Sequence, residues 1–78
     1  ERFAENLVKA RRAAGITQDE LADRCDLHRT EVSLLERAGR EPRLGTLVKL
    51  AGALHVSLES LCAGMSWDEE QQRFRFGK

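Results

Sequence analysis

The sequence has little of several features that would place it in a large class of proteins. Its 78 residues include two cysteines, one proline and no tyrosine, and no apolar run approaches the roughly 20 residues that span a bilayer. The two cysteines form no CxxC motif and have no histidine pair beside them, so neither a zinc site nor a disulfide framework is expected. We expect Cys25 and Cys62 to be small apolar residues of a reduced protein.

The charge has no excess of either sign. Thirteen basic and thirteen acidic residues give a formal net charge of zero, so binding to nucleic acid must depend on where the arginines lie. A chain this short buries only about 60% of the surface that its unfolded form exposes, which leaves no room for a deep catalytic cleft. Because the sequence has no paired carboxylates, Ser/His/Asp set or metal cluster, we expect no enzyme, no cofactor and no metal.

Apolar residues recur at helical spacing in five segments, and short polar stretches separate them, among them a loop around Pro42. Thr17 and Glu20 have the spacing of a capping box, and Ser57 can cap the fifth helix. The residues expected to face inward are Phe3, Leu7 and Val8; Leu21, Ala22 and Cys25; Val32 and Leu35; Leu44, Leu47, Val48, Leu50, Ala51 and Leu54; and Leu58, Leu61 and Cys62. The pattern predicts an all-α domain of five short helices over residues 1–64.

The second and third helices meet in the stretch ELADRCDLHRTEVSLLE, residues 20–36, without a glycine or proline at the join. About four residues connect them, so the two helices must cross sharply. Asp26 stands where the chain reverses, and its short side chain tolerates a positive φ. Ala22 is small enough for a close crossing, and Val32 follows as a core residue. This spacing is that of a helix-turn-helix, whose second helix fits the major groove of DNA.

A longer stretch extends the match: GITQDELADRCDLHRTEVSLLERAGREPRLGTLVKLAGALHVSLESL. It resembles the lambda-repressor-like (Xre/Cro) DNA-binding domain, over about Phe3 to Gly64. The family usually has Gly where Asp26 and His55 stand, and both replacements are residue types enriched at positive φ. It usually has Ser where this chain has His28, and a single Gly where this chain has Ala38-Gly39.

The resemblance implies a sequence-specific transcriptional regulator of double-stranded DNA, bacterial or phage-encoded and cytoplasmic. An arginine can bond guanine O6 and N7, and Thr or Leu can pack on a thymine methyl. The predicted base contacts are His28, Arg29, Thr30, Ser33 and Leu34. His28 has a second interpretation, in which it caps the third helix or touches phosphate.

The residues around that face are expected to contact the DNA backbone. These predicted backbone contacts are Gln18, Arg37, Arg40 and Arg43. Gln18 stands at the start of the second helix, where free N–H groups also attract phosphate. By resemblance to phage repressors, Arg43 has a minor groove as its alternative target. The resemblance also implies that Arg11 and Glu36 form a structural ion pair under the helix crossing.

The last stretch, residues 65–78, differs from the rest of the sequence. Phe74 and Phe76 alternate with arginines, which is a strand pattern, and a lone strand is not stable. It either pairs with a second subunit or is a frayed linker, and Ser66 to Glu69 can form a capped turn. The predicted surface for a homodimer is made of Leu58, Leu61, Met65, Trp67, Phe74 and Phe76.

Two functions follow from the sequence. The first is a regulator that acts as a homodimer on a pseudo-palindromic operator, with double-stranded DNA as its partner and no membrane association. The alternative is the antitoxin of a toxin–antitoxin pair, which binds a protein toxin and regulates its own operon.

Overall fold

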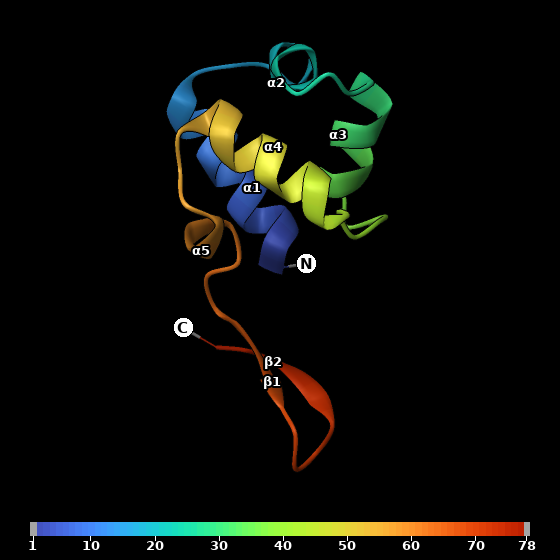
Figure 1. Ribbon diagram of the computed structural model, residues 1–78, viewed down its shortest axis with the longest axis vertical. Helices are drawn as coiled ribbons and strands as arrows, with labels where there is room; N and C mark the ends of the chain where they lie inside the picture. Colours follow the sequence, from blue (N-terminus) through green and yellow to red (C-terminus); the bar gives the residue numbers. More distant parts are fainter. Residues whose placement is uncertain (1, 78) are drawn as a thin grey trace.

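The computed structural model describes residues 2–77. Its elements are α1 (Arg2–Ala14), α2 (Gln18–Arg24), α3 (Arg29–Glu36), α4 (Leu44–Leu54), α5 (Leu58–Leu61), β1 (Met65–Asp68) and β2 (Arg73–Phe76). The five helices pack into one body, and the two strands form a hairpin that extends from one end of it (Figure 1). The hairpin accounts for the elongated shape, which measures 41 × 20 × 19 Å.

All five helices contribute to one core. The core residues are Phe3, Leu7, Leu21, Ala22, Cys25, Val32, Leu35, Leu50, Ala51, Leu54 and Leu61. Two residues of the predicted inward stripe of α4 are not in it, because Leu44 is 73% exposed and Val48 is 51% exposed. The helix is therefore apolar on its outer side as well as on its core side. Within residues 2–77, no helix is long and apolar enough to cross a membrane.

The helix starts follow the capping signals of the sequence. Thr17 Oγ1 accepts a hydrogen bond from the Glu20 amide at 3.0 Å, and the Thr17 amide donates to Glu20 Oε1 at 2.8 Å. This reciprocal pair is the predicted capping box. Ser57 Oγ accepts from the Ser60 amide at 3.0 Å and begins α5 in the same way.

The turn between α2 and α3 contains Cys25, Asp26, Leu27 and His28. Asp26 has a φ of 56° and His55, at the end of α4, has a φ of 57°, so both take the left-handed conformation that the sequence predicted. The Leu27 amide donates to the Ala22 carbonyl at 2.9 Å, which closes the turn. The chain thus reverses without a glycine, and α3 crosses α2 in the helix-turn-helix arrangement.

The predicted strand at Phe74 and Phe76 is present, and its partner lies in the same chain. β2 pairs antiparallel with β1, with Met65 opposite Phe76 and Trp67 opposite Phe74. The predicted capped turn at residues 66–69 is wrong, because most of this stretch is the strand β1. The turn follows β1, where Asp68 Oδ1 accepts hydrogen bonds from the backbone amides of Glu70 and Gln71.

Candidate nucleic-acid interface

α3 lies along one side of the helical body, and the hairpin extends from a different end (Figure 1). The inner face of α3 is held in the core by Val32 and Leu35, both with 0% exposure. Arg29 and Thr30 are exposed at its start, and Ser33 is half-buried one turn later. A rigid inner face therefore holds the predicted base-contacting side chains on the outer side of the helix.

Leu34 is less free than an outward position on α3 suggests. It is half-buried, and a methyl group added to Gly39 would lie 3.2 Å from its Cδ2 atom. The Gly39 amide donates to the Leu34 carbonyl at 2.8 Å, and Ala38 takes a φ of 59° to allow this turn. Gly39 therefore lies close against Leu34, whose side chain is only partly exposed.

His28 occupies the position just before α3, and its side chain makes no capping hydrogen bond. The side chain is exposed, so capping is not the role that the structure shows. The exposed imidazole can therefore face solvent or a bound partner.

Two of the predicted DNA-contacting arginines already have carboxylate partners. Arg29 Nε lies 3.6 Å from Asp19 Oδ1, and Arg40 Nη1 lies 2.7 Å from Glu31 Oε1. Both members of the Arg29–Asp19 pair are exposed, at 65% and 73%, and such a pair contributes about 1 kcal/mol or less. In the second pair Arg40 is 56% exposed, whereas Glu31 is only 23% exposed. Neither pair could be predicted from a local pattern, because the members of each pair come from different elements or from a loop.

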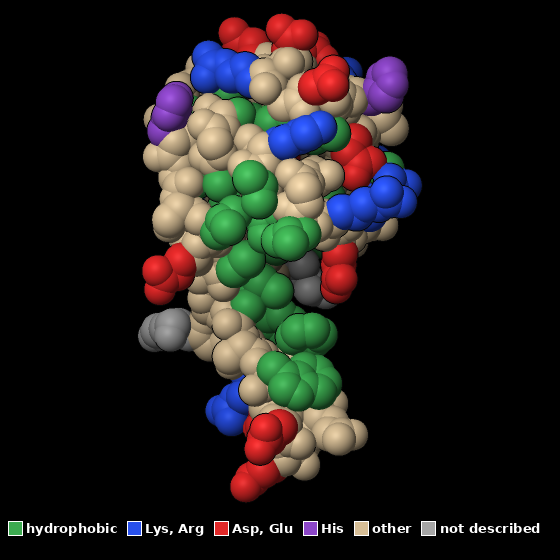
Figure 2. All heavy atoms as spheres, viewed as in Figure 1, with side chains coloured by type: hydrophobic (Ala, Val, Ile, Leu, Met, Phe, Trp, Pro, Cys, Tyr) green, Lys and Arg blue, Asp and Glu red, His purple; other side chains and the backbone are tan. Residues whose placement is uncertain are grey.

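The remaining basic residues follow α3 along the chain. Arg37 ends the helix, and its Nε donates to the Ser33 carbonyl at 3.3 Å. Arg43 stands at the start of α4, is exposed and makes no side-chain capping bond. With Arg40 between them, the arginines recur every third residue from the end of α3 to the start of α4. On the face of the helical body shown in Figure 2, Lys and Arg side chains lie among Asp and Glu side chains and do not form one broad basic patch.

Arg11 and Glu36 lie in contact beneath the helix crossing. Arg11 Nε is 2.6 Å from Glu36 Oε2, and Nη2 is 3.1 Å from Oε1. The two side chains are only 14% and 5% exposed. Arg11 Nη1 also donates to the Ile16 carbonyl at 2.9 Å. The bidentate geometry ties α1 to the end of α3.

The partners of Glu36 decide its protonation. Burial alone raises the pKa of this carboxyl, but hydrogen bonds from Arg11 and Gln18 outweigh burial and leave the pKa below its ordinary value. The hydrogen bond to Glu36 raises the pKa of Arg11 in turn, against the smaller effect of its own burial. The pair is therefore charged across the neutral range.

Gln18 has a role that the sequence did not reveal. Its Nε2 donates to Glu36 Oε1 at 2.9 Å, so the side chain predicted to meet phosphate joins the buried pair from the first position of α2. α1, α2 and α3 thus meet at one carboxylate. No local pattern connects residues 18 and 36, which are far apart in the sequence.

The residues predicted to form the dimer surface differ in how far they are buried. Leu61 is 1% exposed and belongs to the core, so its place on a dimer surface is corrected. Its side chain is inward because α5 is a single turn that closes the core with this one residue. Met65 is half-buried. The others are substantially exposed: Leu58 42%, Trp67 55%, Phe74 53% and Phe76 47%.

The side chains of residues 2–77 that could ligate a metal ion do not gather in one place. Among residues 2–77, no group of three or more His, Cys, Asp and Glu side chains could hold a metal ion. Cys25 is buried and its thiol pKa is raised by that burial, so it behaves as a core residue rather than a nucleophile.

Comparisons with known proteins agree with this geometry. Residues 7–61 match the family model HTH_3, which describes a helix-turn-helix. An uncharacterised HTH-type transcriptional regulator, YqaE of Bacillus subtilis, is 38% identical over 64 residues. That alignment covers 82% of this chain and 55% of YqaE, so the chain spans about half the length of that relative.

Two solved structures share the fold. The restriction-modification controller protein C.AhdI from Aeromonas hydrophila superposes with a TM-score of 0.75 at 35% identity, over 77% of this chain and 91% of C.AhdI. The P22 c2 repressor, solved in complex with a synthetic operator, superposes with a TM-score of 0.72 at 27% identity. That match covers 76% of this chain and 89% of the repressor chain. The helical body therefore has the repressor-like architecture that the sequence predicted.

Proposed function

Because this chain belongs to the HTH_3 family of helix-turn-helix proteins, we propose that it is a transcriptional regulator that binds double-stranded DNA. The observation that carries the proposal is the outer face of α3, where Arg29, Thr30 and Ser33 share one side of a helix whose other side is locked into the core. Such a face presents hydrogen-bond donors to base edges when the helix enters the major groove.

The contacts separate into two kinds. Arg29 and Thr30, with Ser33, the free part of Leu34 and the exposed His28, read bases. Arg37, Arg40 and Arg43 neutralise phosphates on either side of the groove, and such contacts add affinity that is independent of sequence. Gln18 supports this face from below through Glu36, and its predicted contact with the DNA backbone at the start of α2 is kept as part of the proposal.

One domain makes few phosphate contacts and reads only a few base pairs. We therefore propose that two copies bind a pseudo-palindromic operator, with half-sites about 34–36 Å apart. The mating surface must lie away from α3. Leu58 in α5 and the aromatic residues of the hairpin are the exposed apolar residues in that part of the molecule.

The test is selection of binding duplexes from a random pool by the full chain, followed by footprinting of the selected sites. A DNA-reading dimer should enrich a two-fold-symmetric motif whose half-sites are about one helical turn apart. A folded protein that enriches no motif, and that binds all duplexes with equal affinity, would show that α3 does not read sequence.

A second candidate is favoured by one observation, the uncovered aromatic face of the hairpin. An antitoxin would use such a face for its protein toxin and would still bind operator DNA through α3. The two candidates share the DNA-binding surface and differ only in what covers the hairpin.

A further inference from the structure

The hairpin has two chemically different faces. Because Met65 pairs with Phe76 and Trp67 pairs with Phe74, these four side chains lie on one face of the two strands. The other face carries Ser66, Asp68, Arg73 and Arg75, and Arg75 Nη1 lies 3.3 Å from Asp68 Oδ2. All charged residues of the strands are thus on one side, and the opposite side is wholly apolar.

The apolar face is organised but uncovered. The Trp67 and Phe74 rings meet edge to face at 5.1 Å, and the Phe74 and Phe76 rings stack at 6.1 Å. Each of the three is about half exposed, at 55%, 53% and 47%, which leaves roughly 300 Å² of aromatic surface in water. An isolated two-stranded hairpin is only marginally stable in water. Burial of this apolar face against another surface would therefore stabilise it.

The root of the hairpin, residues 61–64 and 76–77, is bonded to α1 and sets how the hairpin leaves the helical body. Asn6 Nδ2 donates to the carbonyls of Leu61 and Ala63 at 2.9 and 3.0 Å, and Arg2 Nη2 donates to the Phe76 carbonyl at 3.3 Å. Gly64 has a φ of 85°, and a Cβ there would lie 2.6 Å from the Gly77 carbonyl oxygen. The two ends of the hairpin therefore pass close together against α1, and the apolar face is held in one orientation.

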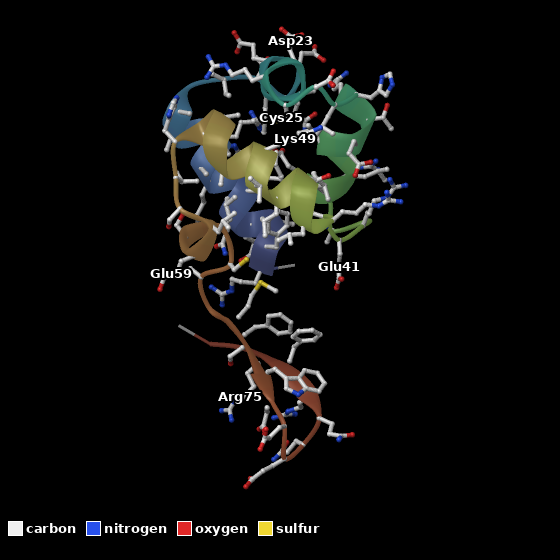
Figure 3. All side chains as sticks on the ribbon, viewed as in Figure 1. Asp23, Cys25, Glu41, Lys49, Glu59 and Arg75 are labelled. Atoms are coloured by element: carbon white, nitrogen blue, oxygen red, sulfur yellow. The ribbon has the colours of Figure 1, made fainter. Side chains whose placement is uncertain are left out.

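A groove of about 420 Å³ separates this face from the helical body. The rings of Phe3, Phe74 and Phe76 line it, and so do the charged side chains of Arg2, Arg40 and Glu41. Figure 3 shows the aromatic rings on the side of the hairpin opposite the labelled Arg75, below the loop that carries Glu41. Figure 2 shows a band of hydrophobic side chains that continues from α4 down to the hairpin.

We propose that this groove is occupied by the hairpin of a second copy of the chain, so that two hairpins stack with their apolar faces together about a two-fold axis. Each Trp67, close to the tip of its hairpin, then reaches toward the root of the other. Two sheets packed in this way lie about 10 Å apart. This inference deepens the proposed homodimer and rests on it.

Three observations favour a second copy as the occupant. The apolar face carries no charged side chain, so it can meet its own copy without like-charge repulsion, as an isologous interface requires. It offers no cation to a nucleic acid. Figure 2 also shows hydrophobic side chains that continue from this face to the helical body, which adds area toward the roughly 800 Å² per partner of a stable interface.

Stacking of faces differs from pairing of strand edges across the two-fold axis. Edge pairing would join β2 to the β2 of the second copy and extend the sheet, but the aromatic face would stay in water. Face-to-face stacking covers the rings and leaves the outer strand edges unpaired. The two arrangements therefore predict different amide protection.

The experiment follows the only tryptophan of the sequence, Trp67, in the full chain. Its emission should shift to shorter wavelength as the protein concentration rises, over the same range in which sedimentation shows the mass doubling. Phe74→Asp should weaken this dimer by at least about tenfold, because it places two carboxylates in the stack. Arg73→Ser, one position away on the polar face, should change the dimer affinity by less than about twofold.

Each other outcome overturns a distinct part of the inference. A full chain that remains a monomer at about 100 μM, with and without a selected duplex, removes the homodimer itself and leaves the apolar face for a different protein. A dimer that Phe74→Asp and Arg73→Ser weaken equally has its interface elsewhere, although the proposed regulator stands. Hydrogen-exchange protection of the β2 amides that point away from β1, without a shift in Trp67 emission, would show edge pairing instead of stacking.

Discussion

The helical body and the hairpin differ in how far their large apolar side chains are buried. In the body, six large side chains are almost completely buried, each below 2% exposure, among them Leu7, Leu21 and Leu50. In the hairpin, the three aromatic residues each keep about half of their surface exposed. The body therefore obtains its stability from its own core, whereas the hairpin offers surface that is only useful against a partner. The contrast matches the two roles that we propose, DNA reading by the helical body and assembly through the hairpin.

The largest expected effect is on the free energy of unfolding, and it appears when one residue from the helical body is compared with one from the hairpin. Leu50→Ala removes a side chain with 0% exposure from the core and should lower the free energy of unfolding by about 2–5 kcal/mol. Phe74→Ala removes a larger but half-exposed side chain and should cost less than about 1.5 kcal/mol in the monomer. Urea unfolding at a low protein concentration measures both. Equal losses would mean that the hairpin is part of the cooperative core.

The buried ion pair gives the next largest effect. Arg11→Met leaves Glu36, which is 5% exposed, without its main partner and should destabilise the body by about 3 kcal/mol. Arg11→Met combined with Glu36→Leu removes both charges and should recover part of the loss. A double variant that is as unstable as the sum of the single changes would show that the two side chains do not act together. Thermal unfolding of the four proteins completes this cycle.

The proposed difference between base contacts and phosphate contacts can be tested with two arginines near α3. Arg29→Ala should lose about 1–3 kcal/mol on a selected duplex and relax the preference at one base pair, because a forked guanine contact is lost. Arg40→Ala should weaken selected and scrambled duplexes alike. Arg29→Ala should not move the sedimentation of the free protein, because Arg29 does not line the groove beside the hairpin. Binding isotherms on the two duplexes measure this, and an equal loss from Arg29→Ala on both would make Arg29 a phosphate contact.

The body could be predicted from the sequence because its signals are local. The Thr17–Glu20 capping box, the residue types at Asp26 and His55, and the spacing of core residues each act within a few positions. The outward Leu44 and Val48 were misplaced because a helical period of apolar residues does not tell which side of a wide stripe meets the core.

The site was less predictable because its determinants are contacts across the fold. Gln18 meets Glu36 only after α2 and α3 cross, and Arg40 meets Glu31 only when the loop turns back. For the hairpin, the alternation at Phe74 and Phe76 predicted one strand. Its partner β1 was not predicted, because residues 66–69 were interpreted as a capped turn.

The smallest expected effect is the pH dependence of the body. The folded pKa of Glu36 lies below its ordinary value of 4.5, so the unfolded chain binds a proton more readily than the folded one. The stability that Glu36 contributes is therefore fully present above about pH 4.5 and is lost as the pH falls through the lower folded pKa. Glu36→Gln should flatten the fall in unfolding free energy on the acid side, although it lowers stability at neutral pH. Glu70→Gln, in the turn of the hairpin, is the matched control, since it removes a carboxylate that Arg11 does not contact. Urea unfolding at a series of pH values from 3 to 7 measures the slopes. If the slope is unchanged in Glu36→Gln, the acid sensitivity of the body comes from other carboxylates.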